Sequence, residues 1–221
     1  MNWSLNELEA MARKAARGAG YSWGLAEEVG KATRWLSAAG LPGPRCLAQL
    51  LSTVDGANFK AFTPTVSAGY CTAEQGVLCP FLTGVALCDG ALDYTPPQVL
   101  TLSNLSVPLL LLPFASQAFE TPRFTLVRLG WAGVRLTLEH GVAYLDGLVG
   151  DLSCSQAASV TLEPVAGTSR PPKGKLIQAQ SRALLDPETC SRLEKFAQRT
   201  FAPATEASRL AGAGSGLSDN D

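Results

Sequence analysis

The sequence predicts an α+β fold, with an N-terminal helical unit, a mainly antiparallel β-sheet, and a C-terminal helix with a Gly-rich tail. Three observations lead to this prediction. Residues 1–56 repeat apolar side chains at helical spacing, and residues 124–163 alternate apolar and polar side chains as half-buried strands do. Asp186-Pro187-Glu188 then combines a capping aspartate, a first-turn proline and a first-turn acid, which indicates a helix start.

A chain of 221 residues can bury a core without cross-links. We expect one domain over residues 1–202, in which residues 1–56 form the helical unit and residues 57–202 form the sheet and the C-terminal helix. Residues 203–221 are rich in glycine and end in acids, and they are predicted to form a tail.

The helical unit should contain three helices. Ser4 and Glu7 fit a capping box at the start of the first helix. The second helix should begin near Ser22, with Glu27 and Lys31 as an outer ion pair. The third should follow the Gly-Leu-Pro-Gly-Pro segment at residues 40–44 and end at Asp55-Gly56.

The middle of the chain has a different composition. Residues 61–119 contain no Lys, Arg or His and only three acids. We expect buried strands and tight loops here, with residues 107–114 as the central strand because this run is continuously apolar. Its two prolines, Pro108 and Pro113, should lie where the strand begins or ends.

The second half predicts a meander of antiparallel strands. His140-Gly141 fits a two-residue hairpin turn between two alternating segments. The expected strands are residues 124–129, 134–138, 142–145 and 159–163, with a last one at 176–185.

Composition excludes some functions and leaves others open. The 18 Lys and Arg residues face 19 Asp and Glu residues, which argues against a nucleic-acid binder. The charged fraction of 17% is below the roughly 25% of typical soluble domains. This favours a protein partner or a homo-oligomer, although a surface covered by Ser, Thr and Gly explains it equally well.

The longest apolar run, residues 107–115, is too short to span a bilayer and contains two prolines. The first residues include acids and no apolar segment of the secretory type, so we expect no membrane association and a cytoplasmic location.

The cysteines are not arranged for metal binding. Six are scattered along the chain without a Cys-x-x-Cys pair, and His140 is the only histidine, so no metal site is expected. In a reducing compartment these thiols should be free and mostly buried. A nucleophilic Cys71 or Cys79 would have to meet His140 through tertiary folding.

The segment Arg17–Glu28 is the strongest candidate for a ligand site. Two glycines precede a predicted helix N-terminus, where free amides and the helix dipole favour a phosphate or a carboxylate. An arginine there would add a charge-assisted contact. The alternative is a helix–helix corner in which the glycines allow the turn and the aromatic residues pack. The candidate residues are Arg17, Gly18, Gly20, Tyr21, Ser22, Glu27 and Glu28.

Other acids and the tail offer further candidates. Glu74, Asp89 and Asp93 have no basic residue nearby in the sequence, so they are either acid–base groups or exposed loop acids. In the tail, Glu206 and Arg209 are candidates for contact with a partner or a ligand, and the alternative is a disordered tail. The sequence identifies no cofactor.

Arg17–Glu28 together with the tail from Pro203 to Asp221 resembles a bacterial family of unknown function over the full length of the chain. The resemblance implies no activity, cofactor or catalytic residue. It implies that the chain is one unit whose two ends are functional.

We therefore expect a cytoplasmic accessory or binding protein that acts through a partner protein or a small anionic ligand. The alternative is a small-molecule enzyme in which Glu27, Glu28, Glu74 or Asp89 supplies acid–base chemistry and Arg17 holds an anionic substrate.

Overall fold

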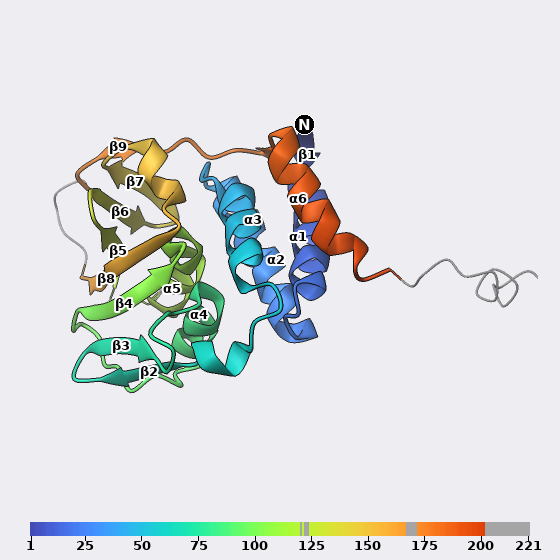
Figure 1. Cartoon of the computed structure of the whole chain (residues 1–221). Helices are drawn as coiled ribbons and strands as arrows, with labels where there is room; N and C mark the ends of the chain where they lie inside the picture. The colour runs from blue at the N-terminus through green and yellow to red at the C-terminus, as the bar shows by residue number, and fades with distance from the viewer. Residues whose placement is uncertain (120, 122–123, 167–171, 202–221) are drawn as a thin grey trace, which may run out of the picture.

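A computed structural model describes residues 1–119, 121, 124–166 and 172–201. A helical layer and an eight-stranded sheet form the two sides of the molecule, and two further helices lie between them against the sheet (Figure 1). This arrangement confirms the predicted α+β class. The helical layer contains α1 (Leu5–Gly18), α2 (Trp23–Ala38), α3 (Gly43–Val54) and α6 (Pro187–Gln198), and the helices between are α4 (Pro80–Cys88) and α5 (Leu112–Phe119).

The first three helices begin and end close to the predicted positions. Ser4 and Glu7 form the capping box of α1, and the backbone amide of Ser4 lowers the pKa of the Glu7 carboxyl. Ser22 caps α2 by accepting a hydrogen bond from the amide of Leu25. The ion pair of α2 differs from the prediction, because Lys31 bonds Glu28 at 2.7 Å rather than Glu27.

The C-terminal helix also begins where the sequence places it. Asp186 caps α6 by accepting a hydrogen bond from the amide of Thr189 at 2.8 Å. The helix packs against α1, far from it in sequence, so the two ends of the described chain lie side by side (Figure 1). Arg199 joins α6 to the end of α3 through two hydrogen bonds to Asp55.

The main sheet is antiparallel except where β3 pairs with β4. His140 and Gly141 have φ angles of +49° and +78° and form the tight turn predicted between two strands. The strands lie in the order β2 (Pro64–Ser67), β3 (Tyr70–Ala73), β4 (Leu100–Ser106), β8 (Gln156–Val165), β5 (Leu126–Trp131), β6 (Val134–Glu139), β7 (Val142–Asp146) and β9 (Lys175–Leu176).

The prediction of a central strand at residues 107–114 was wrong. This run forms the 3-10 helix η2 (Pro108–Leu111) and the start of α5, and β4 immediately before it is a central strand instead. Val107 reverses the chain with a φ angle of +38°. A continuously apolar run marks burial on every side in a helix as well as in a strand, and prolines are favourable in the first turn of a helix.

The last predicted strand, residues 176–185, is divided. Its first residue ends β9 beside β7, and its last residues form β10 (Arg182–Leu184), which pairs with β1 (Asn2–Ser4) in the helical layer. We call residues 175–186 the strap, because they cross from the sheet to the helices (Figure 1). The amide of Gln180 in the strap donates to the carbonyl of Ala38 at the end of α2.

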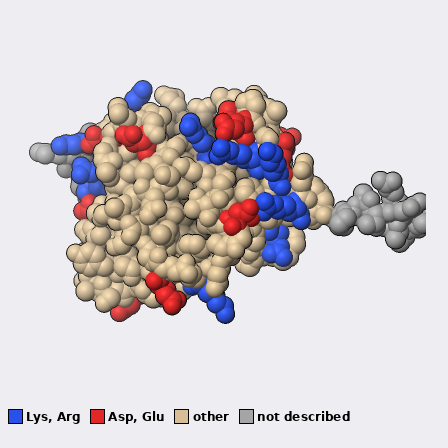
Figure 2. Space-filling view, in the orientation of Figure 1, with Lys and Arg blue, Asp and Glu red and all other residues tan. Residues whose placement is uncertain are grey.

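Apolar side chains from both layers form one continuous core. The middle of the sequence, which has few charged residues, forms a surface with few charges: the face over β3, β4, α4 and α5 shows few charged side chains (Figure 2). Within the described residues, no helix is long and apolar enough to cross a membrane.

Candidate functional site

The residues of the ligand site predicted from the sequence lie at the corner between α1 and α2. Arg17 donates a hydrogen bond to the carbonyl of Tyr21 at 2.7 Å, and its guanidinium lies 5.0 Å from the ring centre of Trp23. The Tyr21 side chain is only 1% exposed, and its hydroxyl lies 3.4 Å from the sulfur of Cys79. Burial raises the pKa of Tyr21 well above its ordinary value, so this phenol stays neutral.

The glycines of the corner lie where other chain segments come close. A Cβ on Gly18 would lie 1.8 Å from the carbonyl oxygen of Phe196 in α6. Gly20 has a φ angle of +104°, which residues with a side chain rarely adopt. Ser22 caps α2, as described above. The corner thus brings Arg17, Tyr21 and Ser22 together, and most of their polar groups bond the corner's own backbone or the core.

The predicted acids are either exposed or engaged in an ion pair. Glu27 is exposed, and Glu28 is engaged with Lys31. Glu74, Asp89 and Asp93 are exposed, which agrees with the loop-acid alternative. The tail candidates Glu206 and Arg209 lie outside the described residues. A ligand site at the corner stays a prediction.

The pairing that a cysteine nucleophile requires is not formed. His140 lies in the turn after β6, four strand positions from Cys71 on β3, which is about 19 Å at the usual spacing. Cys79 follows Leu78, which forms a β-bridge with Leu105 on β4, and β4 lies three strand positions from β6. Cys154 precedes the opposite end of β8 from the His140 turn, and burial raises the pKa of Cys71 to about 12.

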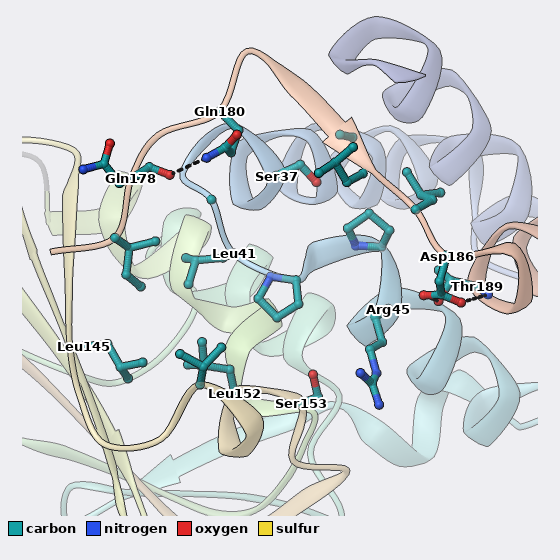
Figure 3. Close-up of a pocket in the computed structure, with 18 of the residues that line it drawn as sticks. Ser37, Leu41, Arg45, Leu145, Leu152, Ser153, Gln178, Gln180, Asp186 and Thr189 are labelled. Atoms are coloured by element: carbon teal, nitrogen blue, oxygen red, sulfur yellow. Dashed lines mark hydrogen bonds between the residues drawn. The ribbon is translucent and has the colours of Figure 1, made fainter. Parts of the chain in front are cut away.

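A cavity that was not predicted from the sequence lies apart from the corner. It has a volume of about 660 Å³ and lies between the α2–α3 connection and the sheet, beneath the strap (Figure 3). This volume is within the usual range of small-molecule sites. Its walls come from five separate segments: the end of α2 with the start of α3, the end of β7, the 3-10 helix η3 (Val149–Ser153), the strap, and Thr189 in the first turn of α6.

The middle of the cavity is apolar. Leu41, Leu145 and Leu152 face it from the α2–α3 connection, β7 and η3 respectively (Figure 3). At the rim, Val149, Leu176 and Leu184 are between 47% and 79% exposed. Large aliphatic side chains in water are unfavourable, so an apolar ligand that covers them gains free energy.

Polar groups lie at two ends of the cavity. Ser37, Gln178 and Gln180 lie at the end where the strap crosses α2, and Arg45 and Ser153 lie where η3 meets α3 (Figure 3). The second contact is close, because the thiol of Cys46, next to Arg45, lies 3.7 Å from the carbonyl of Leu152. We call these the strap end and the arginine end.

The strap end contains a buried hydroxyl without a protein partner. Ser37 is 6% exposed, and its Oγ makes no hydrogen bond to the described residues. A helical serine commonly bonds the carbonyl four residues earlier. Nearby Thr33 does so, donating to Val29 at 2.7 Å, whereas Ser37 does not. An unpaired buried hydroxyl costs about 1–3 kcal/mol, so Ser37 requires an explanation.

The charge around the cavity is positive. Arg45, Lys175 and Arg182 line it together with one carboxylate, Asp186. Hydrogen bonds from the Thr189 backbone amide and hydroxyl hold the Asp186 oxygens at α6 and lower the pKa of this carboxyl. Arg182 donates to Asn2, whereas Arg45 is exposed and has no ion pair among the described residues.

The sequence contains little evidence for this site. Its residues lie up to 152 positions apart, between Ser37 and Thr189, and no two segments share a motif. The one local feature of the sequence at this site is the glycine- and proline-rich turn at residues 40–44. In the structure, a Cβ on Gly40 would lie 2.2 Å from the carbonyl oxygen of Gln178. Such a close approach shows that another segment crosses there, but the sequence does not say which.

Metal binding finds no support in the described part of the chain, where no group of three or more His, Cys, Asp or Glu side chains could hold an ion.

Comparison with curated proteins and with solved structures finds no match. Residues 3–77 match a family model described as a protein of unknown function (DUF3726). This region contains Arg17–Glu28, Ser37 and Arg45, but not the tail. The wider resemblance expected from the sequence, over the full length and to bacterial proteins, stays a prediction. The match covers about a third of the chain, and it shows that the N-terminal third carries a domain of unknown function.

Proposed function

We propose that this chain is a cytoplasmic binding protein for a small anionic ligand with an apolar body, and that the ligand occupies the cavity beneath the strap. One observation carries the proposal: an apolar cavity of about 660 Å³ has an unpaired arginine, Arg45, at one end. An arginine beside apolar walls binds a carboxylate or phosphate through charge-assisted hydrogen bonds.

The location is proposed on the state of the cysteines. All six are free, and three of those most shielded from water, Cys46, Cys71 and Cys79, have pKa values raised by burial. Free thiols are usual in a reducing compartment.

A binding role explains the cavity better than catalysis does. Catalytic acids and bases are usually found in a cleft with shifted pKa values. Glu27, Glu28, Glu74 and Asp89 do not line this cavity, and the carboxylate that does, Asp186, is held at the start of α6. The enzyme alternative therefore stays a prediction without a specific observation in its favour.

The proposal can be tested by calorimetric titration with straight-chain carboxylates of six to ten carbons and with the matching alcohols. Each added methylene should tighten binding by up to about fourfold, because burying one contributes about 0.8 kcal/mol. The alcohols should bind at least tenfold more weakly, because they lack the charge that Arg45 contacts. If no carboxylate binds below millimolar concentration, the proposal is wrong.

The charge-reversal variant Arg45→Glu locates the ligand. It should weaken carboxylate binding at least tenfold and leave alcohol binding unchanged. Arg13→Glu makes the same change on an exposed face of α1 and should have no effect. An equal loss in both variants would show attraction to the overall charge of the protein, not binding in the cavity.

An accessory role through a partner protein is the second part of the proposal. It is supported by the exposed rim residues Val149, Leu176 and Leu184, since apolar patches often mark interfaces. Light scattering and pull-down with the full chain test it. A monomer that recovers no stoichiometric partner would remove the accessory role and leave ligand binding intact.

A further inference from the structure

We propose that the ligand carries two polar groups: an anionic group at the arginine end and an uncharged hydrogen-bonding group, such as a hydroxyl or a carbonyl, at the strap end. This inference rests on the proposed function and specifies its ligand class. Its starting point is Ser37, which faces the cavity from α2 (Figure 3).

The polar residues beside the end of α2, Ser37, Gln178 and Gln180, carry no charge. All three line the cavity there. The Gln180 side-chain nitrogen donates to the backbone carbonyl of Gln178 at 3.2 Å, and the backbone amide of Gln180 donates to Ala38 at 2.8 Å. These bonds fix the strap beside the end of α2 and leave the Ser37 hydroxyl without a partner.

The hydroxyl is also shut off from water. Ser37 is 6% exposed, and its Oγ has almost no accessible surface. Rotation about the Cα–Cβ bond is enough to direct the hydroxyl without moving the backbone, because serine has three staggered positions. In the orientation that the structure shows, no water-sized atom reaches the Oγ, so a ligand bonds it only after this rotation, as a donor or as an acceptor, since a hydroxyl serves as either.

The two ends differ in the chemistry that they accept. At the arginine end, Arg45 offers a cation beside the half-buried Ser153, so the group bound there should be anionic. At the strap end, the side chains of Ser37, Gln178 and Gln180 carry no charge. Two cations of the strap, Lys175 and Arg182, also line the cavity, and the Arg182 guanidinium donates to Asn2.

Leu41, Leu145 and Leu152 line the cavity with apolar side chains. They require an apolar middle in the ligand. An ω-hydroxy carboxylate is the simplest molecule with an anion, an apolar chain and a terminal hydroxyl, and it is the probe that we choose.

The test compares plain carboxylates of six to ten carbons with their ω-hydroxy counterparts by calorimetric titration on the full chain. At the chain length that spans the cavity, the ω-hydroxy acid should bind about 3- to 10-fold more tightly, which is the contribution of one hydrogen bond. In a cavity without the Ser37 contact the order should reverse, because an unpaired hydroxyl is costly to bury.

The variant Ser37→Ala should abolish the preference for the ω-hydroxy acid and leave the affinity for the plain carboxylate unchanged. Ser52→Ala is the matched control, because Ser52 lies in α3 and its hydroxyl donates to Ala48 at 2.9 Å. This control should keep the preference. Thermal unfolding of both variants checks that the fold is retained.

Three outcomes separate the two proposals. Loss of the preference in Ser37→Ala alone supports the two-ended ligand. Binding of plain carboxylates without any ω-hydroxy preference, or with one that Ser37→Ala retains, overturns this inference and leaves the proposed function standing. No binding of any carboxylate overturns both.

Discussion

The corner between α1 and α2 and the cavity beneath the strap contain similar residue types: an arginine, glycines and a serine at or near the end of a helix. At the corner, Arg17 bonds the Tyr21 carbonyl and Ser22 caps its own helix. At the cavity, Arg45 and Ser37 have no such partners among the described residues. Polar groups already bonded to their neighbours stabilise the fold, whereas groups left unpaired beside a cavity are available to a ligand.

The largest expected effect on stability comes from Gly18, the corner glycine that packs against α6. Its replacement by alanine would place a Cβ 1.8 Å from a backbone carbonyl of α6, so we expect a loss of about 3 kcal/mol or more in the free energy of unfolding. Gly24→Ala is the control from the same segment, because its Cβ meets nothing within 4 Å and should stabilise α2 by up to about 1 kcal/mol. Urea unfolding followed by circular dichroism measures both.

If Gly18→Ala unfolds within about 1 kcal/mol of the parent protein, then α6 does not depend on close contact with α1. This result would contradict the packing role of Gly18 and would favour a ligand role for it.

Arg17→Ala tests whether the corner also binds the ligand. Removing the guanidinium breaks one charge-assisted hydrogen bond and one contact with Trp23, which should cost about 2 kcal/mol of stability. Octanoate affinity should stay unchanged. Arg13→Ala, on the exposed side of the same helix, should change neither stability nor affinity. A tenfold loss of octanoate affinity in Arg17→Ala alone would place the ligand at the corner.

Local signals in the sequence predicted local structure well. The capping residues Ser4, Ser22 and Asp186 begin the helices that they were expected to begin, and His140-Gly141 forms its turn. Each of these depends on contacts within a few residues. The alternation of strands likewise depends on one buried face, which the sequence displays directly.

Features that depend on distant residues were missed. Residues 107–114 are apolar on all sides because helices and sheet surround them, and this pattern does not distinguish a helix from a strand. The strap is not the single strand that was predicted, because its two ends pair with strands in different layers. The cavity exists only because the strap crosses α2, so the candidate site could not be predicted from any one segment.

Asp186 lies at the edge of the cavity but acts on the fold, and acid should reveal this. The Thr189 amide lowers the pKa of this carboxyl, so its stabilising contribution is present above the unfolded value of about 3.9 and is lost as the pH falls toward the lower folded value. Asp186→Ala should therefore cost about 1 kcal/mol at pH 7, and the difference from the parent should shrink below about pH 4.

Urea unfolding between pH 3 and pH 7 measures this difference. Glu188→Ala is the control, because this exposed residue in the first turn of α6 does not supply the cap. A difference between Asp186→Ala and the parent that does not change with pH would show that the carboxylate charge has no part in capping α6.

The smallest effects separate a hydroxyl beside the cavity from one in the packed core. Ser37 and Thr83 are the two residues whose buried hydroxyls have no partner in the described part of the chain. Thr83→Val should raise the free energy of unfolding by about 1 kcal/mol, because it removes an unpaired polar group with little change in shape. Since no residue of α4 lines the cavity, the gain should be the same with and without 8-hydroxyoctanoate.

Ser37→Ala should give a similar gain without ligand, for the same reason and because alanine favours a helix. With saturating 8-hydroxyoctanoate the gain should shrink or reverse, because the parent protein then has a partner for its hydroxyl and the ligand stabilises it more than the variant. Thermal unfolding at several ligand concentrations measures the change. A gain that does not depend on ligand for Ser37, as for Thr83, would show that this hydroxyl belongs to the core and that the ligand does not reach the strap end.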